Sequence, residues 1–478
     1  MSARTTENRK ARDTASRRVV VTGMGAITPS GNDVDTLWDS VVAGRSGIGR
    51  LEGQQFEDLA VRIGGQVRDF DAEVLLPRAL ARRLSPVQHW AIAAADQALA
   101  QAGIMTPTAE PKTGAAPKAD DLPWDRSRVA VIAATGSGPV DAMQAATRSL
   151  LESGPRSVPL TLAIHGAPDS AAALLSQRFD FRGPGQGVSA TCASGAVGLG
   201  EGLRRIRHGY ADAVLVVGME DCLNAVNLAS NANMRALAAG FEDDPTSASR
   251  PFDRSRSGFV MSQGAAAILL ESEAGAEARG ATVLAELVGF GAASDAHHPT
   301  NPHPEGRGAA AAVIEALVDA GLDAADIDHI NAHATGTPAG DAAELSAFDA
   351  ALGAPAHSIP ISATKSSTGH LLGASGVVEA LIAIRTMAEQ TLPPTLNLGD
   401  LEFEGWDIVA GDSRAVGHAG GRESGTGEPV DTVLSTSFGF GGHNGAIVLR
   451  RPSPGRAAST RWPPPATAPR ARRHHDRP

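Results

Sequence analysis

The sequence predicts an α/β fold, and three features of its 478 residues carry that prediction. Short β-branched apolar runs recur, each followed by glycine or a helical pattern, which is typical of buried strands in parallel pairing. Ala-rich windows separate these runs, so we expect closely packed helices buried between sheets. Glycine contributes 53 residues and aromatic side chains only 4%, a composition that favours tight turns and close backbone contacts.

The predicted elements follow one another along the chain. Strands are expected at 19–21, 129–132, 213–217, 265–270, 283–288, 327–331, 359–362, 433–435 and 446–449. Ala-rich helices are expected in windows such as 89–102, 309–320 and 377–387. The predicted strands cluster before residue 275 and again from 283 to 451, which suggests an arrangement in two parts.

Polar or Pro-rich segments are expected to lie outside this core. The basic N-terminus, 1–18, and the Pro- and Arg-rich tail, 452–478, are predicted to be disordered because they cannot bury a core. Residues 106–124 are interpreted as a loop insertion between a helix and a strand. A Gly-rich loop is expected at 417–429.

The distribution of charge bears on the choice of partner. The net charge is −11, but both ends of the chain are basic. Residues 1–18 hold six basic and two acidic side chains, and 452–478 hold six and one, which leaves 30 basic and 50 acidic side chains in 19–451. An acidic body argues against nucleic acid as the main partner.

The cysteines and the hydropathy pattern narrow the class of protein further. Two cysteines, Cys192 and Cys222, are too few for a disulfide framework or a multi-cysteine zinc site. The loop histidines at 297, 298 and 303 fit a Pro-rich loop better than a metal site, so no metal is expected. The N-terminus has no apolar signal region and no run of 18 apolar residues occurs, so we expect a cytoplasmic enzyme without a membrane span.

The first candidate for chemistry is Cys192, within 187–196. A β-type stretch ends at this thiol, and small residues then open a helix that is expected to run to about residue 208. A helix N-terminus and its free N–H groups favour the thiolate. The alternative is a buried, inert cysteine, which is the expected interpretation for Cys222.

Three more polar turns follow predicted strands. These turns are 331–341 with His333, 362–370 with Lys365 and His370, and 437–445, where glycines around Phe440 expose N–H groups suited to an oxyanion hole. Taken singly, each histidine could be an ordinary hydrogen-bonded loop residue. Taken together, a thiol, two histidines and a lysine after strands favour thioester acyl transfer.

These four segments together resemble the β-ketoacyl-[acyl-carrier-protein] synthases of the thiolase superfamily, and most of all the elongating type-II ketosynthases. Further matches lie at 20–25, 248–253 and 258–261. The resemblance implies a thiolase-like fold, in which two similar β/α halves, 19–275 and 276–451, form a five-layered αβαβα sandwich. It also implies a dimer.

The resemblance further implies the roles of individual residues. Cys192 would be the nucleophile that takes the acyl chain, and His333 and His370 would bind the malonyl thioester carbonyl and promote decarboxylation. Lys365 would orient and polarise the histidines. The N–H groups of Cys192 and Phe440 would form the oxyanion hole, and Phe440 would also act as a gate. Structural hydrogen bonds around the site are expected from Asp341, Glu379, Thr335 and Thr337.

The implied reaction is a decarboxylative Claisen condensation of a Cys-bound acyl chain with malonyl carrier protein in fatty-acid biosynthesis. No cofactor is expected, because the phosphopantetheine belongs to the acyl carrier protein. The alternative is the ketosynthase subunit of a type-II polyketide or polyene synthase, paired with a chain-length factor, so homodimer and heterodimer both stay open. A non-catalytic chain-length factor is disfavoured by Cys192, and a thiolase by the missing second catalytic cysteine. Asn231 and Pro139 depart from the family pattern near the pocket, which leaves the acyl-chain specificity open and suggests a specialised pathway rather than housekeeping fatty-acid synthesis.

Docking of an acidic carrier protein cannot rest on global attraction, since the body of this chain is acidic too. A local basic patch is therefore expected. By motif position the candidates are Arg82, Arg83 and Arg235, and the alternative is that they are ordinary solvated arginines.

Overall fold

The computed structural model describes residues 17–105, 122–417 and 428–452. Most of the N-terminal segment, the 106–124 insertion, the 417–429 loop and the tail lie outside these ranges, so the disorder predicted for the two ends and the loops predicted at 106–124 and 417–429 stay predictions. In the described ranges, no helix has the length and apolar character needed to cross a membrane.

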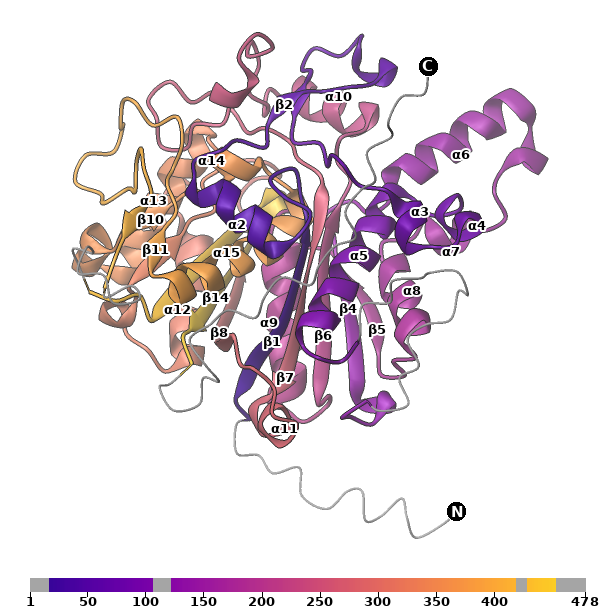
Figure 1. Ribbon diagram of the computed structural model, residues 1–478. Helices are drawn as coiled ribbons and strands as arrows, with labels where there is room; N and C mark the ends of the chain where they lie inside the picture. The colour runs from indigo at the N-terminus through magenta and orange to yellow at the C-terminus, as the bar shows by residue number, and fades with distance from the viewer. Residues whose placement is uncertain (1–16, 106–121, 418–427, 453–478) are drawn as a thin grey trace, which may run out of the picture.

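A ten-stranded mixed sheet forms the centre of the molecule, with the strand order β10-β9-β13-β14-β8-β1-β7-β6-β4-β5 (Figure 1). Its strands are β1 (Val19–Ile27), β4 (Val129–Ala134), β5 (Gly185–Val188), β6 (Ala213–Glu220), β7 (Gly264–Ser272), β8 (Ala285–Ser294), β9 (His329–Asn331), β10 (Ile361–Ser362), β13 (Thr432–Gly439) and β14 (His443–Arg450). Two small ribbons pair β2 (Gly49–Arg50) with β3 (Ile63–Gly64), and β11 (Thr391–Leu392) with β12 (Arg414–Ala415).

The sheet consists of two halves with the same plan. In the first half β5, β4 and β6 are parallel, and β7 and β1 follow antiparallel. In the second half β10, β9 and β13 are parallel, and β14 and β8 follow antiparallel. The halves meet where β1 pairs with β8 over Val20–Glu286 and Val21–Ala285. This repeat confirms the predicted α/β fold of two similar halves, although the division of the chain at residue 275 stays a prediction.

The expectation of parallel pairing is correct for only six of the ten strands. The turn between β13 and β14 explains one exception. Only Phe440–Gly442 separate these strands, and so short a connection reverses the chain and joins antiparallel neighbours.

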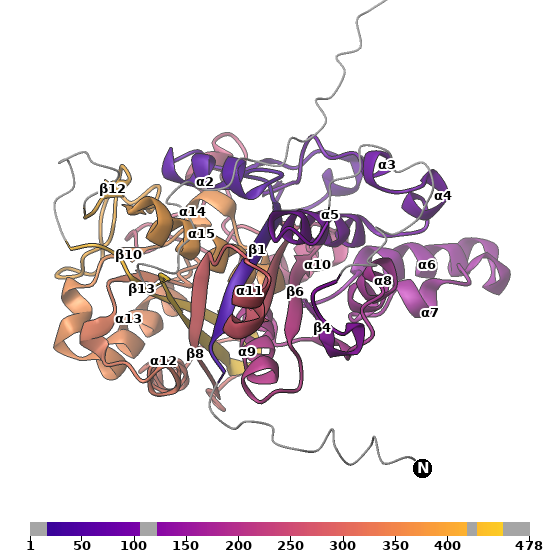
Figure 2. The same ribbon diagram turned by 60° about the horizontal axis from the view of Figure 1, so that its bottom comes forward.

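Helices lie on both outer faces of the sheet and between its halves (Figures 1 and 2). The helices are α2 (Val34–Val42), α3 (Ala72–Leu75), α4 (Arg78–Ala81), α5 (Pro86–Gln101), α6 (Val140–Ser153), α7 (Leu162–His165), α8 (Ser170–Phe179), α9 (Ser194–Arg207), α10 (Ala225–Asn233), α11 (Glu273–Ala278), α12 (Arg307–Ala320), α13 (Pro338–Leu352), α14 (Lys365–Thr368) and α15 (Ser375–Glu389). The central helices α9 and α15 share one apolar core with strands of both halves. Helices α5 and α8 cover the first half, and α12 and α13 cover the second.

The expectation that the Ala-rich helices lie between sheets is therefore correct for α15 and wrong for α5 and α12. Their alanines serve close packing on the outer faces instead. A Cβ atom on Gly23 or Gly25 of β1 would lie 2.0 Å from a carbonyl oxygen of α5, and one on Gly289 or Gly291 of β8 would lie 2.3 or 2.1 Å from a carbonyl oxygen of α12. Both halves thus press a helix backbone directly onto a strand, which explains part of the glycine excess.

Candidate active site

Cys192 lies in a sharp turn between β5 and α9. The preceding residue, Thr191, has a left-handed backbone with φ of +49°, which is rare for a β-branched residue and marks strain. Ser194 fixes the turn, because its Oγ accepts from the Ala190 N–H at 2.8 Å and lies 2.6 Å from the Thr191 carbonyl oxygen. The thiol is buried just ahead of the N-terminus of α9, as the sequence predicted.

The turn between β13 and β14 reaches Cys192 from the other half of the molecule. The Thr191 Oγ1 donates to the Phe440 carbonyl at 2.9 Å, and Gly441 and Gly442 have φ of +82° and +75°, which lets the chain reverse there. The backbone N–H groups of Phe440 and of Cys192 itself lie near the sulfur and act to lower the pKa of the thiol. These are the two N–H groups that the sequence predicted for an oxyanion hole.

Burial dominates the electrostatics of the thiol. It raises the pKa of Cys192 to about 12, while the nearby Lys365 ammonium and the two N–H donors act in the opposite direction. Cys192 is therefore a protonated thiol at neutral pH, and the expectation of a thiolate is wrong for the resting site, because burial outweighs the groups that favour the charged form. The thiol must lose its proton as it attacks.

The two histidines meet edge to face beside this turn. The ring centroids of His333 and His370 are 5.2 Å apart, and the ring of Phe259 packs edge-on against His370 at 5.4 Å. The Nδ1 of His370 bonds the Ser375 Oγ at 3.0 Å. Among the described residues, the Nδ1 of His333 and the Nε2 of His370 have no hydrogen-bond partner.

Burial, and next the positive charge of Lys365, hold the pKa of each histidine well below its usual value. Both rings are therefore neutral at physiological pH. A neutral imidazole can donate one hydrogen bond and accept another, so the two unpaired nitrogens can serve a thioester oxygen or take up a proton.

Lys365 provides the cation of the site. It is 1% exposed, and its Nζ pairs with the Glu379 carboxylate from α15. Burial raises the pKa of Glu379 to about 7, although the ammonium opposes this shift. The ion pair thus places a positive charge near the neutral thiol and the two neutral imidazoles, with the Glu379 carboxylate as its counter-charge.

The Asp341 carboxylate fastens the loop that follows His333. It accepts from the Gly336 N–H at 3.1 Å and the Phe252 N–H at 2.9 Å, and the Arg256 Nε lies 3.4 Å away. Burial raises its pKa to about 7. Nearby, the hydroxyl oxygens of Thr335 and Thr337 are 3.2 Å apart.

Two buried carboxylates that the sequence analysis did not single out also hold this site. Glu344 accepts from the His333 and Ala334 N–H groups at 2.8 and 2.7 Å, and from the Thr436 Oγ1 at 2.8 Å. Glu344 lies three residues after Asp341 on an Ala-rich helix, so both acids share one helix face. This spacing is the sequence pattern that could have identified Glu344. The second carboxylate is Glu220, at the end of β6.

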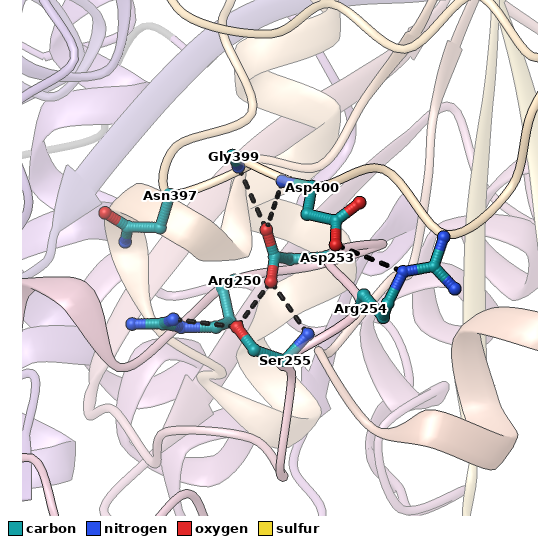
Figure 3. A pocket seen from close by; sticks show the side chains of 7 residues that line it. All are labelled: Arg250, Asp253, Arg254, Ser255, Asn397, Gly399 and Asp400. Carbon is teal, nitrogen blue, oxygen red and sulfur yellow. Dashed lines mark hydrogen bonds and ion pairs between the residues drawn. The ribbon is translucent and has the colours of Figure 1, made fainter.

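A surface pocket of about 390 Å³ lies between the segments 250–255 and 397–400 (Figure 3). Its Asp253 carboxylate accepts from the Ser255 hydroxyl and from the N–H groups of Ser255, Gly399 and Asp400. Burial acts to raise its pKa, but these bonds outweigh burial and lower the pKa to about 2. Neither the thiol nor the two histidines line this pocket, so it is not the site of the chemistry. The hydrogen bonds of Asp253 hold the surface loops that line it. Within the described ranges, no three His, Cys, Asp or Glu side chains converge as metal ligands.

The proposed docking arginines are all exposed. Arg82 and Arg83 follow α4, and Arg235 follows α10 with φ of +56°. The neighbouring Ser85 donates to Asp141 in the first turn of α6, which follows the carboxyl end of β4. Arg82 and Arg83 therefore lie toward the end of the first half that carries the Cys192 turn.

Comparisons with known proteins agree with this arrangement. The chain matches the family models for the beta-ketoacyl synthase N-terminal domain over residues 16–276 and the C-terminal domain over 284–399. It is 39% identical over 437 residues to a 3-oxoacyl-[acyl-carrier-protein] synthase 2 of Synechocystis, with 91% of this chain and 98% of the relative covered.

Two solved structures are also similar to this chain over most of its length. One is a type II polyketide synthase acyl carrier protein in complex with its hexaketide-bound ketosynthase, with 26% identity, a TM-score of 0.78 and 91% of this chain and 100% of that chain covered. Another is the ishigamide ketosynthase/chain length factor, with 29% identity, a TM-score of 0.79 and coverage of 92% and 100%. The resemblance predicted from the sequence is thus confirmed, and the chain belongs to the β-ketoacyl synthase family.

Proposed function

We propose that this protein condenses a Cys192-bound acyl chain with malonyl carrier protein to give 3-oxoacyl carrier protein, as in fatty-acid elongation. One observation carries the proposal: a buried thiol with two N–H donors lies beside two neutral imidazoles and a buried ammonium. The similarity to 3-oxoacyl-[acyl-carrier-protein] synthases supports it.

The first step transfers the acyl group. The sulfur of Cys192 attacks the carrier thioester carbonyl, and the N–H groups of Cys192 and Phe440 stabilise the oxyanion. The carrier's C–S bond then breaks, and the departing sulfur takes the proton that the thiol has lost. The result is an acyl-Cys192 thioester and a free carrier thiol.

The second step forms the carbon–carbon bond. Malonyl carrier protein loses carbon dioxide, and the electron pair of the broken C–C bond forms an enolate whose oxygen accepts from His333 and His370. The enolate carbon attacks the acyl-Cys192 carbonyl, and the resulting oxyanion again accepts from the two N–H groups. Breaking the C–S bond releases the 3-oxoacyl product and leaves the Cys192 thiolate. This thiolate takes a proton from water, because the proton of the resting thiol left with the carrier thiol in the first step.

The expected partner is an acyl carrier protein, whose phosphopantetheine arm would deliver both substrates, so the chain would need no cofactor of its own. The complex of a related ketosynthase with its carrier protein supports this partner. Such a reaction fits the cytoplasm, where we propose that the protein acts.

A second subunit is also proposed, and the surface of the first half supports it. Strand β5 ends the sheet with an open edge, and apolar side chains on and between α6 and α7 are exposed by 44% to 92%. These side chains are Met143, Leu150, Leu151, Leu160 and Ile164. A second copy would cover them in a homodimer, and a chain-length factor would do so in a polyketide ketosynthase.

The second candidate function is that polyketide role, which the similarity to the ishigamide ketosynthase/chain length factor favours. The two roles differ in a measurable way. Sedimentation of the protein alone yields a stable dimer in the first case, whereas the second requires co-expression with a chain-length factor to give a stable, active pair.

The direct test of the condensation uses the full chain with acyl- and malonyl-carrier protein. Wild-type protein should release carbon dioxide and form 3-oxoacyl carrier protein, and mass spectrometry should find the acyl group on Cys192. If Cys192→Ala protein forms as much condensation product as the wild type, the proposal fails.

A further inference from the structure

Glu220, at the end of β6, is a fully buried carboxylate, and within the described part of the chain it accepts hydrogen bonds only from uncharged groups. Its Oε2 accepts from the Gly136 and Gly373 N–H groups at 2.6 and 3.0 Å. Its Oε1 accepts from the Ser137 N–H and Oγ at 3.2 and 2.6 Å, and from the Thr135 Oγ1 at 3.3 Å. One carboxylate thus satisfies three backbone N–H groups that would otherwise be buried without a partner.

These donors come from two turns, one in each half of the molecule. Thr135–Ser137 follow β4, and Gly373 lies in the turn between His370 and α15. The turns touch backbone to backbone, because a Cβ atom on Gly373 would lie 2.2 Å from the Gly136 nitrogen. Glu220 is therefore a clamp between the halves.

Each clamped turn holds one reacting group. In the first half the Ser194 Oγ lies 3.1 Å from the Thr135 carbonyl oxygen, and the same serine fixes the backbone around Cys192. In the second half Gly373 lies two residues before Ser375, whose hydroxyl bonds the ring of His370. A shift of either turn would therefore move the thiol relative to the imidazole.

We propose that Glu220 is a positioning residue, which sets Cys192 against His370 by clamping the turn after β4 to the turn after His370. This inference rests on the proposed function and adds to it a group that touches neither substrate nor the reacting atoms. Since the thiol and the imidazole act together only in condensation, the clamp matters most for that step.

The charge of Glu220 provides a second, independent readout. This carboxylate raises the pKa of the Cys192 thiol, in the direction opposite to the effect of Lys365. Glutamine at position 220 keeps an oxygen for the Gly136 and Gly373 N–H groups and an amide NH2 for the two hydroxyls, while the Ser137 N–H loses its acceptor. The substitution also removes the negative charge. It should therefore retain much of the clamp and lower the pKa of the thiol.

The test compares Glu220→Ala and Glu220→Gln with Asp221→Asn, a control that removes the neighbouring buried acid without touching the clamped turns. Three rates are measured on the full chain: condensation, decarboxylation of malonyl carrier protein, and alkylation of Cys192 by iodoacetamide across pH. Glu220→Ala should lower condensation about 10- to 100-fold and decarboxylation much less. Glu220→Gln should speed alkylation at neutral pH by about tenfold per unit fall in the pKa of the thiol. Asp221→Asn should leave all three rates unchanged.

Two outcomes would overturn the proposal. One is equal loss of condensation and decarboxylation in Glu220→Ala, which would mean a general loss of structure; the other is an alkylation profile of Glu220→Gln that matches the wild type. Glu220→Gln keeps the test decisive if the alanine variant does not fold. A wild-type protein without condensation activity, combined with a shifted alkylation profile, would count against the proposed function and not against the influence of Glu220 on the thiol.

Discussion

The turn after β5 and the turn after β10 occupy equivalent places in the two halves, but they carry opposite chemistry. The first leads into α9 and holds the thiol of Cys192, while the second leads into α15 and holds Lys365 and His370. The two helices begin against each other, because a Cβ atom on Gly376 would lie 2.6 Å from the Ala196 nitrogen. A repeated fold thus brings a nucleophile and a charge-stabilising cluster to one point.

Burial acts on the two turns with opposite sign. It raises the pKa of Cys192 and lowers the pKa of His333 and His370, so that the thiol and both rings are neutral. Lys365 supplies the remaining positive charge. A site of this kind stabilises negative charge that appears only during the reaction, which is where electrostatic stabilisation increases the rate.

The largest expected effect separates the two turns directly. Cys192→Ala should lower condensation by at least about 10³-fold, because the nucleophile is lost. Decarboxylation of malonyl carrier protein, which depends on the other turn, should persist, and carbon dioxide release without 3-oxoacyl product would show this. Loss of both activities in a protein with wild-type circular dichroism would contradict the division of labour.

Removal of the buried cation should be the next largest effect. Lys365→Met leaves the Glu379 carboxylate buried and unpaired, which should lower the free energy of unfolding by about 3–5 kcal/mol. The double variant Lys365→Met/Glu379→Met removes both charges and should recover most of that stability without recovering condensation. Urea denaturation measures the free energy of unfolding. A double variant as unstable as Lys365→Met would show that the unpaired Glu379 carboxylate does not cause the loss of stability.

Acid should destabilise the second turn through its histidines. In the native state the pKa of His370 is depressed, so the unfolded state binds more protons below about pH 6.5. The contribution of the neutral His370 to the unfolding free energy is fully present above that pH and is lost as the pH falls. His370→Asn should reduce the slope of unfolding free energy against pH by up to about 1.4 kcal/mol per pH unit.

Carboxylates such as Asp341 have raised pKa values, so their contribution to the unfolding free energy falls as the pH rises. Wild type and His370→Asn both contain these carboxylates, so their contribution cancels when the two slopes are subtracted. The measurement is urea denaturation of wild type and His370→Asn at a series of pH values. Identical slopes would mean that His370 is not buried in its neutral form.

The smallest expected effect concerns the surface of the first half. Arg82→Glu with Arg83→Glu should raise the KM for carrier-protein substrates about tenfold at low salt, because the docking patch would repel an acidic partner. Reaction with small thioester mimics should be unchanged, and the effect should shrink as salt rises. Arg182→Glu with Arg451→Glu is the matched control, since the exposed Arg182 and the half-buried Arg451 lie at the strand ends opposite the Cys192 and Phe440 turns. Equal loss with both kinds of substrate would remove the docking role.

The sequence by itself determined the α/β class, the approximate places of the strands and the residues at their carboxyl ends. These features follow from local causes: β-branched runs form strands, and glycine- and threonine-rich turns follow them. The motif set around Cys192, His333, Lys365 and His370 also sufficed to identify the family, because its order along the chain is specific.

Only the tertiary structure decided which turns touch. The clamp at Glu220 joins residues 136 and 373, and the Thr191 Oγ1 donates to the Phe440 carbonyl across 249 residues of the chain. Pairing over such distances depends on how two similar halves close around α9 and α15, and no local pattern encodes it. The same closure places α5 and α12 on the outer faces, where their alanines meet strand glycines, and so an Ala-rich pattern alone could not tell an outer helix from a central one.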